Sequence, residues 1–457
     1  MRELHLLLLL SLPLVLTAQD SLNVRHLSNW DDPSVPIGSQ LLFNRYNEVW
    51  GHAAAGREYA ILGSTLGIHF IDITDPATPI EVDRVLGRFS GEGVVHRDVK
   101  VHAGHVYAVC DQGASSLQII DLQHLPDSVH VVYDSDEILV RAHNIQIDTV
   151  NARLYTNGGS TQFSVISIAD PAQPVLLSDL EADVQWWNNS IGYVHDCFVR
   201  DNIVWVNDED GMHVVDFTDP LDPIILGSLT DYPFAGYNHS GWMNDDGTLY
   251  VMADETHGSP LKFVDATDLS DLQVISTVSP GTHPFSVVHN PFFTGDLVHV
   301  AYYFDGYYLW DASDPLQPQL IGFYDMNQIP HNDSYMGAWG VYPYLPSGRV
   351  LVSDMQSGLW VLDIDQAVAI KETSSHSTFR VQPSITAGPV SIRSESSIEG
   401  PITMRIFDAA GRTVQQIGSV QVPMEVDLGG SNDGLYFIHI EAGDRTTTQR
   451  IMKIGDR

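Results

Sequence analysis

The chain has 457 residues, of which 58 are acidic and 22 basic, so its formal net charge at pH 7 is −36. A negative excess of this size argues against nucleic acid and against anionic membrane surfaces as partners, because phosphate groups are repelled by such a surface. It is compatible with divalent cations or cationic partners, and a well-solvated surface explains it equally well.

The N-terminus has the features of an export signal. Residues 1–18 contain an early Arg2, an apolar core and small residues just before Gln19. This pattern is typical of a signal peptide that is cleaved after Ala18. The apolar stretch is shorter than a comfortable membrane span and no other segment approaches one, so we expect an exported mature chain without a transmembrane segment.

A sequence repeat occupies the next part of the chain, from residue 19 to residue 372. Each of seven copies has a short apolar run that closes on a marker residue, then a turn, which contains proline in most copies, and a second apolar run. Successive markers are 46 to 52 residues apart, a period typical of repeat architectures. The marker residues are Asp72, Asp121, Ser167, Asp216, Asp265, Asp311 and Asp363.

Each copy is preceded by two further strand-like segments, so each repeat supplies four antiparallel strands. Seven such repeats predict an all-β fold, a seven-bladed β-propeller over residues 19–372; a linear solenoid is the alternative. We expect Leu22–Trp30 to be the outer strand of the last blade, although it would also suit a mobile leader. Cys110 and Cys197 fall in blades two and four, too far apart for a disulfide.

The repeat ends at residue 372, and the sequence that follows has a different composition. Residues 373–378 are a polar linker, and residues 379–457 contain short strand-like segments that predict a small β-sandwich. The segments MRIFDAAGRTV (404–414), VDLGG (426–430), GLYFIHI (434–440) and RIMKI (450–454) resemble the C-terminal sorting domain of Bacteroidetes type IX secretion substrates. This resemblance implies contact with the type IX secretion machinery through residues 379–457, and a location outside the cell or on the outer-membrane surface. An ordinary accessory sandwich is the alternative.

The propeller region resembles a family as well. NEVWGHAAAGREYAILGSTLGIHFIDITDP, HRDVKV, RAHNI, HSGWM and GAWGVYPYLPSGRVLVSDMQSGLWVL are similar to the choice-of-anchor B proteins, which are built from LVIVD repeats. The resemblance implies a propeller with an exchangeable anchor, here the sorting tail, and it implies no particular reaction.

A histidine opens the first strand of six repeats, and a tryptophan takes its place in the seventh. Because the first strand of each propeller blade lines the central channel, these residues are expected to converge near one mouth and to bind a ligand there. The predicted ligand-binding residues are His52, His96, His143, His195, His239, His289 and Trp339, with Asp98 as the partner of His96. The aromatic residues Trp186, Trp187, Tyr237, Trp242, Tyr302 and Tyr303 are expected near the rim.

A divalent metal ion is one candidate ligand, because imidazole and carboxylate groups suit such ions. The predicted metal ligands are His96, His143, His195, His239, Asp111, Asp208 and Asp254. Carboxylates at the ends of second strands would orient the imidazoles. Asp254, Glu255 and His257, in a longer connection, form a second metal candidate.

Three functions therefore remain open. The first is an exported binding protein for a small molecule, a glycan or a protein. The second is a metal-dependent hydrolase or lyase that uses the ring, with an aspartate as base. The third is a structural or adhesive surface protein whose histidines only bond internally. An enzyme is the less favoured interpretation, since no nucleophile elbow, phosphate loop or dinucleotide fingerprint is present.

Overall fold

The fold is described from a computed structural model. It describes residues 21–326, 329–369 and, within 379–453, all but 383–384, 387, 395–401, 409–412, 429, 431–433 and 443–444. The predicted signal peptide (residues 1–18) and linker (373–378) lie outside the described residues and stay predictions. The chain divides into two compact units, residues 1–367 and 368–457.

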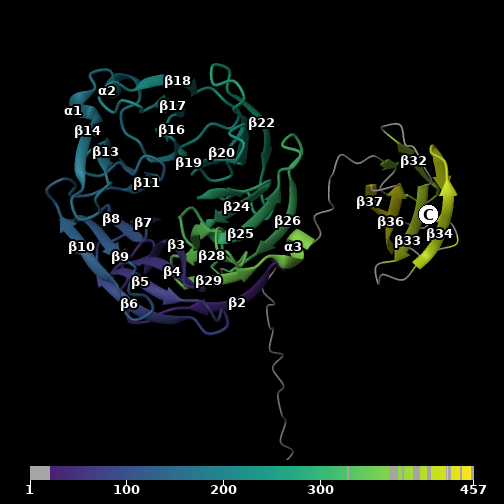
Figure 1. The fold of residues 1–457 in the computed structure, drawn as a ribbon, viewed down its shortest axis with the longest axis horizontal. Helices are drawn as coiled ribbons and strands as arrows, with labels where there is room; N and C mark the ends of the chain where they lie inside the picture. Colours follow the sequence, from purple (N-terminus) through teal and green to yellow (C-terminus); the bar gives the residue numbers. More distant parts are fainter. Residues whose placement is uncertain are drawn as a thin grey trace, which may run out of the picture. The chain divides into compact units, whose positions relative to one another are not determined.

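Seven antiparallel sheets form the first unit and are arranged around a central axis (Figure 1). The first strand of each sheet lies innermost, and the later strands follow outward. The seven-bladed propeller predicted from the repeat is therefore confirmed.

The first four blades each consist of four consecutive strands. Blade one is β3 (Tyr46–Ala54), β4 (Arg57–Ser64), β5 (Gly67–Asp72) and β6 (Ile80–Leu86). Blade two is β7 (Arg97–His102), β8 (His105–Cys110), β9 (Leu117–Asp121) and β10 (His130–Ser135). Blade three is β11 (Asn144–Asp148), β12 (Arg153–Asn157), β13 (Phe163–Ser167) and β14 (Val175–Asp179). Blade four is β15 (Asp196–Arg200), β16 (Ile203–Asn207), β17 (Met212–Asp216) and β18 (Ile224–Leu229).

The last three blades complete the circle. Blade five is β19 (Asn238–Met243), β20 (Leu249–Asp254), β21 (Leu261–Asp265) and β22 (Gln273–Val278). Blade six is β23 (Pro291–Thr294), β24 (Leu297–Tyr302), β25 (Gly306–Asp311) and β26 (Gln319–Tyr324), joined by β1 (Ser21–Leu22). Blade seven is β27 (Ala338–Tyr342), β28 (Val350–Asp354) and β29 (Gly358–Asp363), joined by β2 (Arg25–Trp30).

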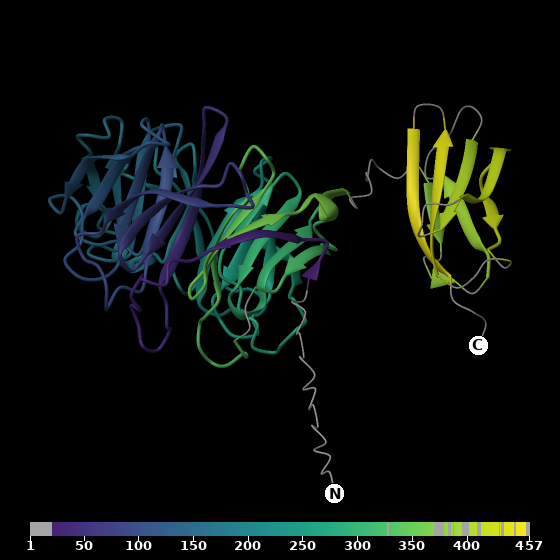
Figure 2. The same ribbon diagram turned by 90° about the horizontal axis from the view of Figure 1, so that it is seen from below.

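The ring is closed by the N-terminal strand. β2 pairs antiparallel with β29, so the expected closure of the last blade is confirmed (Figure 2). The preceding residues differ from the prediction, because β1 pairs with β26 of blade six instead. Asn23 lies between them with φ of 53° and donates from Nδ2 to the Ile321 carbonyl at 2.8 Å. Because of this bend, residues 21–30 pair with two neighbouring blades, through β1 with blade six and through β2 with blade seven.

The marker residues end the third strand of every blade, and their chemistry explains the repeat. In six blades the marker aspartate accepts a hydrogen bond from the backbone N–H two residues later, as from Thr74 to Asp72 at 2.9 Å. In five of the turns a second aspartate does the same, as from Ala77 to Asp75 at 3.1 Å. Aspartate favours this turn because its carboxylate replaces a backbone acceptor. Part of the acidic excess therefore forms turns.

Helices are few and short. α1 (Leu180–Asp183) and α2 (Trp187–Ser190) lie between blades three and four, η1 (Tyr303–Asp305) is a 3₁₀ turn in blade six, and α3 (Asp365–Ala369) follows blade seven. None of the helices in the described ranges is long and apolar enough to cross a membrane. Cys110 and Cys197 are both buried and free, in β8 and β15.

The second unit consists of two sheets. The smaller has the strand order β30 (Phe379–Gln382), β32 (Val390–Ser394), β35 (Met424–Val426). The larger has the order β31 (Ile385–Thr386), β37 (Arg445–Lys453), β36 (Gly434–Ala442), β33 (Ile402–Asp408), β34 (Thr413–Val420). Both sheets contribute apolar side chains to one core, including Phe379, Ile392, Ile406 and Ile438. This is the sandwich that the tail sequence predicts.

Blade six contains a buried histidine that makes the propeller sensitive to acid. His299 on β24 bonds through Nδ1 to the Tyr307 hydroxyl at 2.8 Å and through Nε2 to Thr294 Oγ1 at 2.7 Å. Burial lowers the pKa of His299 to about 3. The folded protein therefore keeps this ring neutral at pH values where the unfolded chain binds a proton, so its stabilising contribution is lost as the pH falls below about 6.5.

The expected result is a difference in pH dependence between the protein and its His299→Gln variant. From pH 7 to pH 5, the free energy of unfolding should fall by about 2 kcal/mol more in the protein than in the variant. Urea unfolding at both pH values measures this, with tryptophan fluorescence as the signal. Parallel losses in the two proteins would contradict the assignment, whatever their stabilities at pH 7.

Candidate functional site at the histidine ring

Five imidazoles and one indole form a closed ring around the central axis. Neighbouring ring centroids are 4.2 to 4.6 Å apart from His96 to Trp339. Trp339 returns to His96 at 5.1 Å and closes the circle. The members are, in order, His96, His143, His195, His239, His289 and Trp339.

The repeat geometry places these side chains. Each member stands just before the first strand of its blade or near its start, where the second strand ends. The backbone N–H of His143, His195 and His289 donates to the carbonyls of Asn157, Asn207 and Ala301, each at 2.9 Å. The same hydrogen bond in blades three, four and six directs these side chains to one level. The structure brings together six of the seven residues that the sequence analysis placed in one ring.

His52 is not part of the ring. It pairs with Tyr59 near the outer end of β3, and its imidazole stacks on Tyr59 at 6.2 Å between centroids. β3 is nine residues long and bulged between Tyr46 and Val49, so His52 lies six residues, or about 20 Å of strand, beyond its start. Blade one contributes no aromatic member, and the larger indole of Trp339 reaches across it to His96.

The ring is dry. His96, His195, His239 and His289 are between 2% and 6% exposed. Burial lowers the pKa of His96, His195 and His239 well below the ordinary value, and the neighbouring histidines lower it further. Burial likewise lowers the pKa of His289 to about 3. At neutral pH these rings are therefore uncharged, and each offers one N–H donor and one lone pair.

Five of the eleven ring nitrogens are buried without a hydrogen-bond partner among the described residues. His289 Nδ1 bonds to the Trp339 carbonyl at 2.7 Å, and His143 Nδ1 bonds to Asp111 Oδ2 at 3.1 Å. Both ring nitrogens of His96, Nδ1 of His195, Nδ1 of His239 and Nε1 of Trp339 have no hydrogen-bond partner among the described residues. A buried polar atom without a partner costs about 1–3 kcal/mol, so their clustering is typical of a binding site.

The predicted carboxylate ligands are only partly near the ring. Asp111 contacts His143, as expected for an orienting carboxylate. Asp208 instead bonds to His213 Nε2 at 3.0 Å and accepts from the Gly211 N–H at 2.7 Å. Asp254 lies 3.1 Å from the ammonium of Lys262 and accepts from Tyr232. Asp208 directly follows the second strand β16, and Asp254 ends the second strand β20. Both contact the adjacent third strand, so they serve blade packing.

Asp98 belongs to a separate polar layer rather than to His96. It accepts from the Lys100 ammonium at 2.7 and 2.9 Å and from the Ile145 N–H at 2.8 Å. Asp98 follows His96 by two residues, but its hydrogen bonds go to Lys100 and Ile145, and neither ring nitrogen of His96 has a hydrogen-bond partner among the described residues. Glu48, Lys100, Gln146, Asp196 and Asn290 help to line a small cavity at this layer, with about 10 Å³ accessible to the centre of a water molecule.

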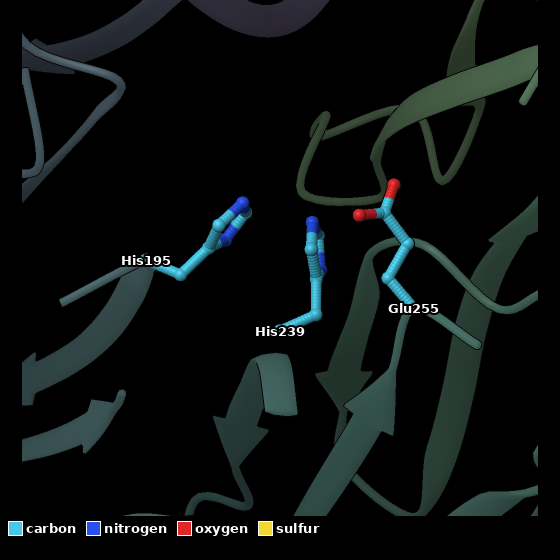
Figure 3. Close-up of side chains that lie close together, drawn as sticks. All are labelled: His195, His239 and Glu255. Atoms are coloured by element: carbon cyan, nitrogen blue, oxygen red, sulfur yellow. The ribbon is translucent and has the colours of Figure 1, made fainter. Parts of the chain in front are cut away.

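Glu255 reaches the ring, and the sequence only hinted at it. Its carboxylate, His195 and His239 each offer a ligand atom, and these three atoms lie within 4.8 Å of one another (Figure 3). Glu255 directly follows β20, so the connection after this strand carries it toward the axis. His257, which the sequence analysis grouped with Asp254 and Glu255, bonds to the Ser334 carbonyl at 3.2 Å instead.

The loops on this face expose aromatic side chains. Phe43 and Phe234 have φ of 53° and 58°, in the left-handed region that bulky residues avoid, and are 51% and 66% exposed. Phe285 is 48% exposed. All three precede first strands, as the ring does. Among the aromatic residues expected at the rim, Tyr237 and Tyr303 contact ring histidines, whereas Trp187 is fully buried against Phe163 and Phe217 in a hydrophobic core.

Comparison with known proteins supports the tail and the fold. Residues 382–454 match the family model of the secretion system C-terminal sorting domain. The match indicates export by the type IX secretion system, to the cell surface or beyond it, and thus contact with that machinery.

Among solved structures, the chain resembles the β-propeller domain of Cps50 (Swd1) from Myceliophteria thermophila, with a TM-score of 0.51 and 10% identity over 74% of this chain and 98% of that one. A Lactobacillus plantarum protein solved by the Northeast Structural Genomics Consortium has a TM-score of 0.47 and 10% identity, covering 84% of this chain and 98% of its own. The first likeness supports the propeller fold alone. No curated protein matches the chain.

Fold and tail together define the class of protein: a secreted β-propeller that carries a C-terminal sorting domain.

Proposed function

We propose that this chain is an exported binding protein whose ligand docks on the face of the propeller that carries the histidine ring. The observation that carries the proposal is the closed ring itself, with its buried nitrogens left without partners. A scaffold role alone would be expected to satisfy these nitrogens within the fold, as it does for His299.

The same face offers a suitable chemistry for a polar ligand with a flat apolar side. Neutral imidazoles can both donate and accept hydrogen bonds, and the strained, exposed Phe43 and Phe234 provide stacking surfaces. Bulky residues in strained conformations are often found at binding sites. Sugars, amino sugars and small peptides have this combination of polar edges and apolar faces. The proposal includes membership of the propeller in the LVIVD-repeat family, which the sequence segments quoted above support.

A metal-dependent hydrolase or lyase is the second candidate, favoured by the juxtaposition of His195, His239 and Glu255. A bound ion would supply an activated water or polarise a substrate. The purely adhesive alternative differs from both, because it predicts that small ligands leave the stability of the propeller unchanged.

The test is a thermal-shift panel on the metal-stripped mature protein, with neutral sugars, amino sugars and dipeptides as probes. We expect at least one probe to raise the melting temperature of the protein and of His52→Gln, whose changed residue lies away from the ring. The same probe should fail on His143→Ala, which removes the ring member beside Asp111. No shift from any probe, or a shift that survives His143→Ala, would overturn the proposal.

A further inference from the structure

We propose that His195, His239 and Glu255 bind one divalent transition-metal ion, with zinc as the best fit. This inference deepens the proposed function, since it assigns an ion to part of the same ring. It names a ligand set that differs from the one the sequence suggested, because Glu255 replaces the three aspartates.

The first argument is convergence from separate strands. His195 precedes β15, His239 lies in β19 and Glu255 follows β20, yet their ligand atoms lie within 4.8 Å of one another (Figure 3). Tetrahedral zinc with bonds near 2.0–2.1 Å needs ligand atoms about 3.3 Å apart. Small rotations of the three side chains close that gap, and the carboxylate end of Glu255 is the most adjustable of them.

The second argument is that two imidazole nitrogens of this cluster are buried without hydrogen-bond partners. His195 and His239 are 6% and 3% exposed, and Nδ1 of each is buried without a hydrogen-bond partner. A metal ion would use lone pairs that the fold leaves unused. Imidazole binds metals in its neutral form, through the lone pair of one ring nitrogen.

The third argument is an outer layer that holds the ligands. The Tyr303 hydroxyl donates to Glu255 Oε1, and the Tyr335 hydroxyl donates to the Glu255 carbonyl at 3.4 Å. Tyr237 packs edge-on against His195 at 5.3 Å and donates its hydroxyl to Glu209 at 2.7 Å. Metal sites depend on such outer contacts to orient their ligands.

The donor set selects the kind of ion. Calcium and magnesium prefer six or more oxygen ligands, and this cluster offers two nitrogens and one carboxylate. Two histidines with one carboxylate suit zinc, and they also suit ferrous iron. Three protein ligands would leave coordination positions for water or for a bound ligand, which connects the ion to the docking face.

The experiment is zinc titration of the chelator-treated mature protein by calorimetry, in excess magnesium to suppress weak binding to the acidic surface. We expect one saturable site. His195→Gln and His239→Gln should each weaken it on the order of 100-fold or more, and Glu255→Gln by about 10- to 100-fold. The His52→Gln control, which changes a histidine outside the ring, should bind zinc as the unmodified protein does.

X-ray absorption at the zinc edge then reads the ligands directly. A first shell of nitrogen and oxygen with imidazole scattering is expected, and it should be altered in His239→Gln. Elemental analysis of the protein purified without added metal shows whether iron takes the place of zinc, which would overturn the choice of ion.

Two results would overturn the site itself: no saturable binding, or equal affinity in the protein and in His195→Gln. The failure of this inference is distinguishable from that of the proposed function. If the metal-stripped protein still binds a sugar or dipeptide in a manner that depends on His143, the docking face stands and only the ion is lost. If neither zinc nor any probe binds, both proposals fail.

Discussion

Replacing Lys100 with methionine is expected to lower the free energy of unfolding of the propeller by about 3–5 kcal/mol. The Lys100 ammonium is buried and lies 2.7 Å from Asp98 Oδ1. Burial alone would lower the pKa of Lys100, but Asp98 and Glu48 outweigh it and raise the pKa, so the group stays charged. Its loss would leave Asp98 buried without a counter-charge.

The neighbouring acids make this lysine more important. Burial raises the pKa of Glu48 to about 7 and that of Asp196 well above its usual range, while Lys100 opposes both shifts. Without the ammonium, the pKa values of Glu48 and Asp196 would rise further, because burial would act on them without this opposing charge. The Lys100→Met variant should therefore lose more stability at pH 8 than at pH 6, because deprotonated acids then face each other unneutralised.

Urea unfolding followed by tryptophan fluorescence measures this effect in the propeller alone. All nine tryptophans lie at or before Trp360, so the tail gives no signal. The control is the double variant Lys100→Met with Asp98→Asn, which removes both charges and should recover part of the loss. A single variant as stable as the unmodified protein at both pH values would show that the ammonium does not hold this layer together.

The repeat made the propeller predictable because its turn chemistry is local. An aspartate that ends a strand, accepts from the N–H two residues on and precedes a second aspartate and a proline specifies a reversal wherever it occurs. Asp72 and Asp216 show the same contact in blades one and four. The blade count and the closing strand follow from repeating that unit. The bend at Asn23 does not follow from the repeat, because it depends on a hydrogen bond to the Ile321 carbonyl, 298 residues away.

The ring was predictable in blades two to seven because each member has the same place before its first strand. The prediction was wrong for His52, since the long, bulged β3 breaks the alignment between sequence position and depth along the axis. It was also wrong for Asp208 and Asp254. Their side chains are committed to His213 and Lys262, partners that period alone cannot reveal.

The position of Glu255 could not be predicted from the sequence. Its approach to His195 and His239 depends on the path of the connection after β20, and on Tyr303 and Tyr335 from other blades. Nothing in the local sequence reports such contacts. The insertion that forms α1 and α2 was missed for the same reason, because Trp187 packs on Phe163 and Phe217, which belong to other elements of the chain.

Removal of residues 21–30 from the mature chain is expected to open the propeller. β2 supplies the fourth strand of blade seven through five paired positions on β29, and Asn29 Nδ2 adds a bond to the Leu359 carbonyl at 3.0 Å. With roughly 1 kcal/mol for each lost hydrogen bond, the deletion costs about 5 kcal/mol. For a domain of roughly 350 residues that lowers the melting temperature by about 7 °C, measured by tryptophan fluorescence.

A peptide added in trans tests whether the loss of stability comes from the missing strand β2 or from unspecific effects of the truncation. The peptide SLNVRHLSNW, residues 21–30, should bind the truncated protein and restore much of the lost melting temperature, because β29 then regains its partner. The same peptide with Ser28→Pro lacks a donor within the paired segment and should restore little. Equal rescue by both peptides, or a truncated chain that melts like the intact one, would show that β2 lies on the last blade without holding the circle closed.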